Sequence, residues 1–212
     1  MVAVKICGVR DPDMVRLADE AGADWIGFMF VEKSVRAVSV DAVASLMLPI
    51  RRARPVAVLA DAEDGLIDAV VETGIPVLQL HGGETPARVA EVKARTGIEV
   101  WKALGVSDGA DLARASDYEA ADRLLIDAKA PAGAAVTGGH GAAFDWDVLE
   151  GWDAPKPWLL AGGLTAATVA EAVRRTGAEA VDVSSAVERV RGWKDGQLVR
   201  SFLRSAKGPG QR

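Results

Sequence analysis

The segment Thr176-Gly177-Ala178-Glu179-Ala180-Val181-Asp182-Val183 ends a helix-like run at a glycine and passes at once into an apolar run. Glycine just past a helix end accepts the left-handed conformation that terminates the helix. Four such joints in one chain predict an alternating α/β protein. The other three are Ala21-Gly22-Ala23-Asp24, Thr73-Gly74-Ile75-Pro76 and Thr96-Gly97-Ile98-Glu99.

Eight apolar runs alternate with eight amphipathic runs, which leaves about 26 of the 212 residues for each strand–helix unit. This length is close to the minimum for a strand, a helix and two loops. The candidate strands are Val2–Cys7, Trp25–Phe30, Pro55–Ala60, Val77–His81, Ile98–Ala103, Arg123–Asp127, Pro157–Ala161 and Ala180–Ser184, and the helix-like runs cover 11–21, 40–51, 63–73, 85–96, 108–120, 145–151, 165–176 and 195–206.

Eight parallel strands can close into a (β/α)8 barrel or remain an open doubly wound sheet. An open sheet that binds a dinucleotide would carry Gly-x-Gly-x-x-Gly, but Gly139-His140-Gly141 is followed by Phe144 three positions on. A Gly-Lys-Ser/Thr phosphate loop is absent as well. We therefore predict a single (β/α)8 TIM barrel over residues 1–206, followed by a C-terminal tail over 207–212.

Composition and charge narrow the class of function. The chain has 25 Lys and Arg against 30 Asp and Glu, and the net charge of −5 disfavours nucleic-acid binding. No apolar stretch approaches the ~18–20 residues of a membrane span, and no secretory signal is visible at the N-terminus. The single cysteine excludes an internal disulfide and suits a reducing compartment, so we expect a cytoplasmic protein.

Polar side chains interrupt the predicted strands, where an interior built only for packing would carry Val, Ile and Leu. Several fall at the C-terminal ends of strands, the edge at which barrel enzymes place their chemistry. Each alone has an ordinary explanation as a buried thiol, a turn residue or a structural histidine, but together on one rim they favour a site. The polar positions are Lys5 and Cys7, Gln79 and His81, Lys102, Asp127, and Asp182 and Ser184, and those that end their strands on the rim are Cys7, His81, Asp127 and Ser184.

The segments after the seventh and eighth predicted strands indicate an anion site. Leu160-Ala161-Gly162-Gly163-Leu164 leads into a helix, and Val183-Ser184-Ser185-Ala186 leaves the last strand. In (β/α)8 barrels the loops at these places frequently hold phosphate with backbone N–H groups and a helix N-terminus. Gly138 and Gly139, after the sixth strand, would add further donors.

Metal-dependent and serine-hydrolase chemistry fit the sequence poorly. The two histidines, His81 and His140, are 59 positions apart, and neither HExxH nor a paired-cysteine spacing occurs. The Gly-x-Ser-x-Gly of an α/β-hydrolase is absent. Cofactor-free acid–base chemistry remains, with no metal site expected.

A series of short motifs runs along the chain: Lys5-Ile6-Cys7-Gly8, Gly22–Phe28, Ser34-Val35-Arg36, Leu78–Gly82, Leu125-Ile126-Asp127, Gly138-Gly139 with Phe144-Asp145-Trp146, Leu160–Leu164, Val181–Ser185 with Val187-Glu188, and Gly192–Asp195. In content and order they resemble the phosphoribosylanthranilate isomerase family from about residue 4 to residue 203. The resemblance implies the ribulose-phosphate-binding type of (β/α)8 barrel.

The resemblance also implies an activity in tryptophan biosynthesis. That family converts N-(5-phosphoribosyl)anthranilate to 1-(o-carboxyphenylamino)-1-deoxyribulose 5-phosphate, an Amadori rearrangement, without a cofactor. Carried over by position, Asp127 is the general acid that opens the furanose ring, and Cys7 is the general base that removes the C2′ proton. Arg36 holds the anthranilate carboxylate, Asp182 and His81 bind the substrate, and the phosphate is bound by Gly138, Gly139, Gly162, Gly163, Ser184 and Ser185.

These roles place opposite demands on the two catalytic groups. Cys7 works as a base only as thiolate, so we expect its pKa to be lowered from ~8.5, with Lys5 as a neighbouring charge. Asp127 must hold a proton near neutrality, which needs a desolvated site or nearby negative charge.

Three positions depart from the family pattern and concern phosphate binding. Ala186 replaces a glycine and would be strained if the backbone there needs a positive φ. His140 replaces a threonine, and Thr168 replaces an asparagine.

Two rival hypotheses remain. Another phosphosugar isomerase on the same barrel, such as the imidazole-pathway isomerase, is expected to carry an aspartate where Cys7 stands. A non-catalytic phosphosugar-binding barrel would have no need of intact Cys7, Asp127 and Arg36. We expect a monomer or homodimer that acts on a small phosphosugar and binds neither nucleic acid nor membrane.

Overall fold

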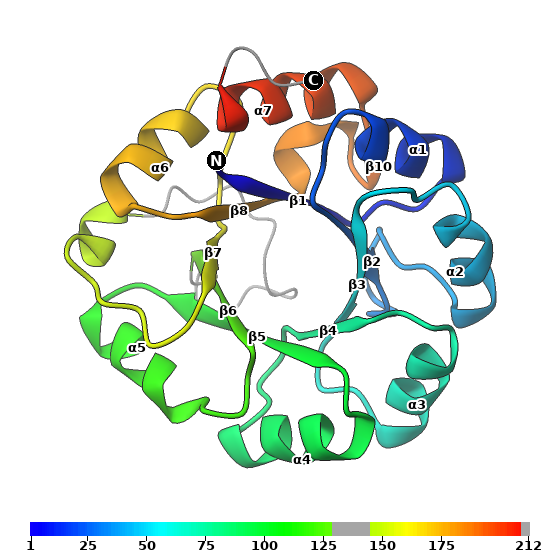
Figure 1. Cartoon of the computed structure of the whole chain (residues 1–212), viewed down its shortest axis with the longest axis horizontal. Helices are drawn as coiled ribbons and strands as arrows, with labels where there is room; N and C mark the ends of the chain where they lie inside the picture. Colours follow the sequence, from blue (N-terminus) through cyan, green and yellow to red (C-terminus); the bar gives the residue numbers. More distant parts are fainter. Residues whose placement is uncertain (129–144, 209–212) are drawn as a thin grey trace.

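A closed ring of eight parallel strands forms the centre of the computed structural model, which describes residues 1–128 and 145–208. The strands pair in sequence order, and β1 closes the ring against β8 (Figure 1). The predicted (β/α)8 barrel is therefore confirmed. The strands are β1 (Ala3–Cys7), β2 (Trp25–Met29), β3 (Arg54–Leu59), β4 (Val77–Leu80), β5 (Glu99–Val106), β6 (Arg123–Ala128), β7 (Trp158–Leu160) and β8 (Ala180–Val183).

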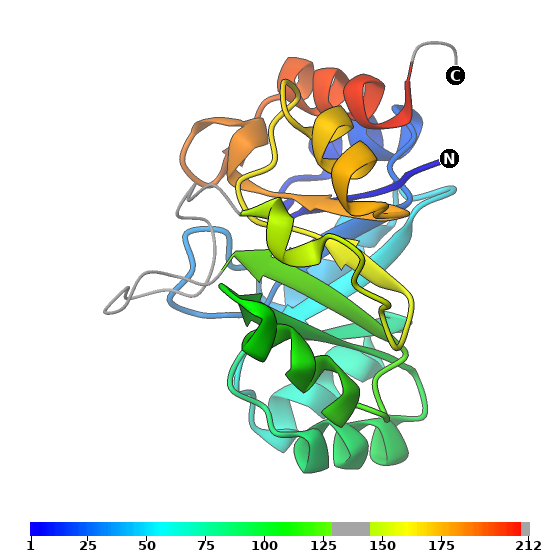
Figure 2. The same ribbon diagram turned by 90° about the vertical axis from the view of Figure 1, so that its left-hand side faces the viewer.

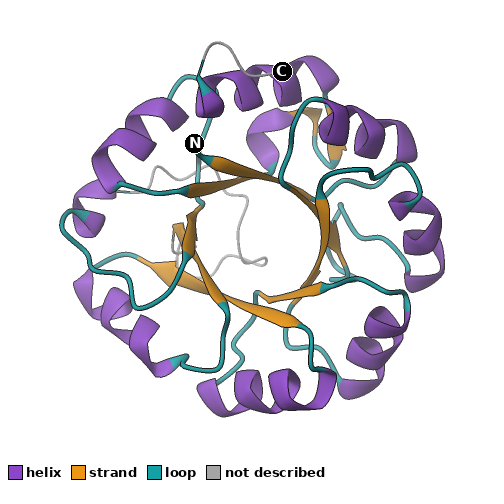
Figure 3. Ribbon diagram, viewed as in Figure 1, coloured by secondary structure: helices purple, strands orange, loops and turns teal. Residues whose placement is uncertain are grey.

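Helices surround the ring on its outside (Figure 3). The region 108–120 forms a short α-helix followed by a 3-10 helix, and 145–151 forms only a 3-10 turn. The α-helices are α1 (Pro12–Glu20), α2 (Val40–Met47), α3 (Asp64–Glu72), α4 (Pro86–Thr96), α5 (Gly109–Ala113), α6 (Val169–Thr176) and α7 (Gly196–Lys207), and the 3-10 helices are η1 (Arg114–Asp117), η2 (Trp146–Leu149) and η3 (Ser185–Val187).

The helix-to-strand joints have the backbone that the sequence predicts. Gly22, Gly74, Gly97 and Gly177 all have positive φ, from 69° to 94°. At Gly97 and Gly177 the left-handed residue is the C-cap of α4 and α6. At each of these four joints the chain therefore leaves the helix through a backbone conformation that only glycine adopts without strain.

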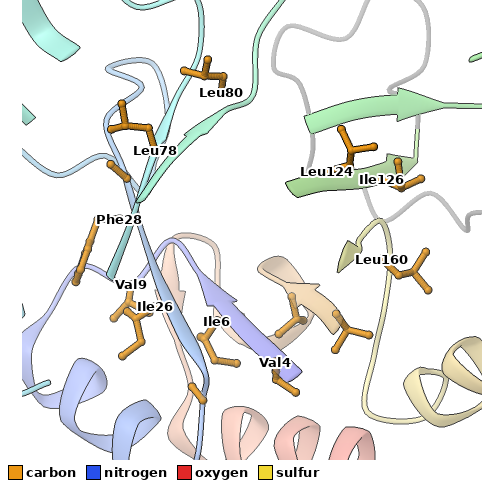
Figure 4. Packing of buried hydrophobic residues seen from close by; sticks show 14 of the residues in the cluster. Val4, Ile6, Val9, Ile26, Phe28, Leu78, Leu80, Leu124, Ile126 and Leu160 are labelled. Carbon is orange, nitrogen blue, oxygen red and sulfur yellow. The ribbon is translucent and has the colours of Figure 1, made fainter. Parts of the chain in front are cut away.

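Two apolar layers pack on opposite faces of the strands. The outer layer lies between the strands and the helices, and Figure 4 shows part of it around Ile6, Ile26 and Phe28. The inner layer fills the N-terminal half of the barrel, where Trp25 and Trp101 meet edge to face at 5.3 Å between ring centroids. The barrel interior is therefore filled at the N-terminal ends of the strands, and a site must lie at their C-terminal ends.

The segment between β8 and α7 contains short elements that were not predicted from the sequence. After β8 the chain forms η3 and then an antiparallel pair, β9 (Glu188–Val190) and β10 (Trp193–Lys194), before α7 begins. In the side view this orange segment lies at the left, opposite the N-terminus of β1 (Figure 2). Across the described ranges 1–128 and 145–208, the helices are too short or too polar to cross a membrane.

Candidate active site

The inner face of the barrel changes from apolar to polar toward the C-terminal ends of the strands. Ala3 packs on the inner apolar layer, and side chains alternate along a strand, so Lys5 and Cys7 also point inward. The structure thus brings the predicted polar side chains to one mouth. The other inward residues are Gln79 and His81 after Val77, Asp127 after Leu125, and Asp182 and Ser184 after Ala180.

Lys102 does not belong to this mouth. Its ammonium lies 2.7 Å from Glu84 Oε2 and 2.7 Å from the carbonyl oxygen of Gly82, in the layer between strands and helices. Its neighbours Trp101 and Ala103 fill the interior instead. Alternation along β5 therefore sends Lys102 outward, and the expectation that it is one of the polar residues of the barrel interior is wrong.

Cys7 ends β1 with its side chain almost fully buried; the residue is 4% exposed. Burial raises the pKa of the thiol, Lys5 and Lys194 lower it, and Asp182 raises it, with a raised pKa as the result. The expected lowering is therefore wrong. Lys5 acts in the predicted direction, but loss of hydration penalises the thiolate more strongly than the lysine stabilises it.

A buried ion pair joins β1 to β8 beside the thiol. Lys5 Nζ lies 2.7 Å from Asp182 Oδ1. Burial lowers the pKa of Lys5, but the negative charges of Asp182 and the Cys7 thiolate raise it by more. The lysine therefore stays an ammonium, and it holds the Asp182 carboxylate in place.

His81 faces the carboxylate of Asp127. Its Nε2 lies 3.6 Å from Asp127 Oδ2, and its Nδ1 lies 2.8 Å from Nε2 of the buried Gln79. When the amide N–H donates, Nδ1 accepts, and a neutral ring then carries its proton on Nε2. Gln79 thus turns an N–H of His81 toward Asp127.

Arg36 reaches the mouth from the segment between β2 and α2. Its Nε and Nη2 donate to Glu188 Oε1 and Oε2 at 2.7 and 2.8 Å. Lys194 Nζ lies 2.7 Å from the same carboxylate. Burial alone would raise the pKa of Glu188, but the two cations lower it to about 2.

Lys194 was quoted in a sequence motif without a role, and the structure places it inside the site. Its side chain is 1% exposed, and its ammonium lies 3.0 Å from the carbonyl oxygen and 3.1 Å from Oγ of Ser184. The Ser184 hydroxyl donates to the carbonyl oxygen of Cys7 at 3.1 Å. No sequence signal identified this link, because β10 was read as part of a loop.

A cleft opens beside these residues at the ends of β6, β7 and β8. Gly162 has φ of 85° and lies so close to β6 that a Cβ would stand 2.6 Å from the Ala128 nitrogen and 3.0 Å from Asp127 Oδ1. Glycine is therefore needed here. The cleft is lined by Asp127, Ala161, Gly162, Gly163, Leu164, Asp182, Val183, Ser184, Ser185 and Ala186.

The departures from the family pattern have different outcomes. Ala186 lies within η3, and Asp61 is the only non-glycine residue with positive φ in the described part of the chain, so the backbone at Ala186 does not need a positive φ and no such strain arises. Gly138, Gly139 and His140 lie outside the described residues.

Within residues 1–128 and 145–208, no three His, Cys, Asp or Glu side chains gather as a metal site.

Residues 4–205 match the family described as N-(5'phosphoribosyl)anthranilate (PRA) isomerase. The N-(5'-phosphoribosyl)anthranilate isomerase of Hyphomonas neptunium is 56% identical over 207 residues, which cover 98% of each chain. The chain belongs to the PRA isomerase family.

Solved structures of this family have the same fold. The dimeric phosphoribosylanthranilate isomerase of Thermotoga maritima, crystallised as mutually generated monomers, is 32% identical with a TM-score of 0.85, covering 98% of this chain and 99% of its own. A second PRA isomerase, 31% identical with a TM-score of 0.85 and the same coverage, was crystallised with reduced 1-(o-carboxyphenylamino)-1-deoxyribulose 5-phosphate.

Proposed function

We propose that this chain isomerises N-(5'-phosphoribosyl)anthranilate, with Asp127 as general acid and Cys7 as general base. The observation that carries the assignment is the position of Asp182. It binds Lys5 on the strand of Cys7, and it lines the same cleft as Asp127. A thiol and a carboxyl group thus flank one mouth, which is the arrangement that acid–base chemistry on neighbouring sugar atoms needs.

Ring opening is the first step of the proposed reaction. Asp127 donates its proton to the furanose oxygen, the bond from that oxygen to C1′ breaks, and the anthranilate nitrogen forms a Schiff base with C1′. The N–H of His81 that faces Asp127 then stabilises the carboxylate left behind. This role for His81 refines its expected role in substrate binding.

Proton removal from C2′ is the second step. The Cys7 thiolate takes this proton and leaves an enolamine, which tautomerises to the ketone of the aminodeoxyribulose product. The protons given by Asp127 and taken by Cys7 balance, so the reaction needs no cofactor. Asp182, held by Lys5, is placed to orient the sugar hydroxyls.

Arg36 is assigned to the anthranilate carboxylate. A guanidinium has five N–H donors, and Glu188 accepts from two of those on Arg36. Three donors remain, and the second N–H of Nη2 with one N–H of Nη1 forms the end-on edge that binds a carboxylate with two hydrogen bonds.

The phosphate is assigned to the cleft between the ends of β7 and β8. Gly162 and Gly163 lead toward α6, and Ser184 and Ser185 lead into η3. Backbone N–H groups in such segments form anion-binding concavities. Gly138 and Gly139 keep their place in this proposal on the sequence alone.

The test is turnover of N-(5'-phosphoribosyl)anthranilate, followed by the loss of its fluorescence. Cys7→Ser and Asp127→Asn should each lower kcat by roughly 10²–10⁴-fold, with circular dichroism spectra like that of the unchanged protein. A wild-type rate in either variant would mean that the acid–base pair is misassigned. Binding of substrate without turnover by the unchanged protein would instead favour the phosphosugar-binding barrel.

A substrate comparison tests Arg36 separately. Arg36→Ala should raise KM for the anthranilate substrate by roughly 10–100-fold, and it should change KM little for the aniline analogue that lacks the carboxylate. Equal effects on both substrates would count against a carboxylate clamp. Turnover of the aminoimidazole phosphosugar, which is the substrate of the rival isomerase, would support the alternative activity.

Assembly and location remain predictions for this chain. A homodimer agrees with the dimeric Thermotoga maritima relative, and sedimentation equilibrium distinguishes it from a monomer. The cytoplasmic location rests on the single cysteine.

A further inference from the structure

Four charged side chains interact electrostatically with Cys7, and a fifth, Glu188, binds two of them. They come from four places in the fold: Lys5 from β1, Asp182 from β8, Arg36 from the β2–α2 segment, and Glu188 and Lys194 from β9 and β10. Three cations and two anions leave one positive charge within the described residues. A buried cluster with one excess cation favours an adjacent anion, and Cys7 supplies that charge only when its thiol is ionised, against the effect of burial.

Lys194 is the cation whose charge is least compensated. Lys5 has its own carboxylate in Asp182, whereas Lys194 shares Glu188 with the bidentate Arg36. Burial lowers the pKa of Lys194, and Glu188 opposes that effect. Glu188 and Cys7 favour the charged ammonium, but burial outweighs them and the pKa of Lys194 is lowered as a result.

Contacts fix the ammonium relative to the strand that carries the thiol. Lys194 Nζ binds both oxygen atoms of Ser184 at 3.0 and 3.1 Å, and the Ser184 hydroxyl donates to the Cys7 carbonyl oxygen. The positive charge of Lys194 lowers the pKa of the thiol against the effect of burial. Two independent features, the contact chain and the charge balance, therefore point to Cys7.

We propose that Lys194 is a positioning residue for the general base: Glu188 and Ser184 hold its ammonium where it stabilises the Cys7 thiolate. The inference deepens the proposed function, since it rests on Cys7 as the base. It gives β9 and β10 a function, which is to hold a charged pair beside the strand that carries Cys7.

The chain offers a direct measurement, because Cys7 is its only cysteine. Thiolate absorbance in the ultraviolet, taken as the difference from Cys7→Ser, titrates this group alone and needs no substrate. Lys194→Gln keeps a polar, hydrogen-bonding side chain but removes the charge. We expect the titration midpoint to rise by about one pH unit or more, and Lys194→Arg should restore it to near the original value.

Lys102 provides a matched control. Lys102 and Glu84 form a second buried pair at 2.7 Å, with side chains 2% and 4% exposed, against 1% and 2% for Lys194 and Glu188. Lys102→Gln should lower stability in a similar way and leave the Cys7 titration unchanged. An unchanged midpoint in a folded Lys194→Gln would overturn the proposal, and so would an equal shift in Lys102→Gln.

If Lys194→Gln fails to fold, Lys194→Met and the rate of Cys7 alkylation by iodoacetamide against pH provide the same test. Turnover then separates the two proposals. If the thiol midpoint rises in Lys194→Gln but the unchanged protein does not turn over the substrate, only the isomerase assignment is wrong. If the unchanged protein turns over the substrate but the thiol midpoint does not move in Lys194→Gln, only the role of Lys194 is wrong.

The pH profile of kcat/KM gives a readout that a merely structural lysine would not move. Because the thiolate is the active form, activity is lost as pH falls through the pKa of Cys7. The acidic limb of the profile should therefore move to higher pH in Lys194→Gln by the same amount as the titration. A uniform loss of rate with an unmoved limb would contradict the proposal.

Discussion

At the scale of single residues, Gly27 shows how closely the base is packed. It lies on β2 beside Cys7 in the register between β1 and β2. A Cβ on Gly27 would stand 3.1 Å from Cys7 Sγ and 3.2 Å from Lys5 Cε. Close approach, and not a positive φ, therefore favours glycine here, because a Cβ would push its neighbours by a few tenths of an ångström.

Gly27→Ala should displace the thiol by a few tenths of an ångström. Because small misplacements of reacting groups are costly, we expect kcat to fall by about tenfold or more, with little change in KM. Gly65→Ala in α3, where a Cβ meets nothing within 4 Å, is the control and should keep full activity. A wild-type kcat in Gly27→Ala would show that the site tolerates the displacement.

The sequence identifies the residues of the site better than their partners. Cys7 and Asp127 stand out because strand alternation and strand ends place them at the mouth. Glu188 and Arg36 are in contact although they are 152 positions apart in the sequence. A local sequence pattern does not predict a contact between residues so far apart. The pKa of Cys7 was misjudged for the same reason, because the burial that raises it depends on the closed barrel.

At the scale of elements, α1 is fastened to the segment before β3 by one carboxylate. Asp19 is buried near the end of α1, and it accepts hydrogen bonds from the backbone N–H groups of Arg51, Arg52 and Ala53 at 3.1, 2.9 and 2.7 Å. This single side chain satisfies three donors of an otherwise irregular segment.

Asp19→Ala should lower the free energy of unfolding by about 2–4 kcal/mol, because buried donors lose a charged acceptor. Urea unfolding gives this value, and the activity of the folded fraction should be retained, since Asp19 is remote from the mouth. Asp13→Ala removes an exposed partner of Arg16 and should cost less than about 1 kcal/mol. Equal losses in the two variants would contradict the clamp.

The boundaries of regular elements follow local chemistry, and the failures lie where tertiary contacts decide. All eight strands lie within about two residues of the predicted runs, except that β5 extends to Val106. The pair β9 and β10 was missed because its short strands have no long apolar pattern and are fixed by Glu188 and Lys194. The division into a domain over 1–206 and a tail stays a prediction, although α7 includes Lys207.

At the scale of the whole molecule, one ion network ties three loops of the mouth together. Arg36 lies in the loop after β2, and Glu188 and Lys194 lie after β8. Arg10, in the loop after β1, donates to the carbonyl oxygen of Val35 at 2.6 Å. The loops after β1, β2 and β8 are therefore linked, and Glu188 is the anion that joins the last two of them.

The stability of the molecule should consequently depend on the protonation of Glu188. Its pKa in the folded protein is about 2, against an ordinary value of 4.5. Because the folded pKa is depressed, the stabilisation is fully present above about pH 4.5 and is lost as pH falls toward 2. A shift of this size corresponds to about 3 kcal/mol.

The free energy of unfolding of the unchanged protein, minus that of Glu188→Gln, isolates this contribution from the other carboxylates, which both proteins share. Measured by urea unfolding, the difference should be constant from neutral pH down to about pH 5 and shrink by about 3 kcal/mol toward pH 2. Asp64→Asn removes an exposed acid that pairs with Arg88 and Arg95, and solvent screening should keep its difference small at every pH. A difference for Glu188→Gln that does not change with pH would mean that Glu188 is not the anion that holds the rim.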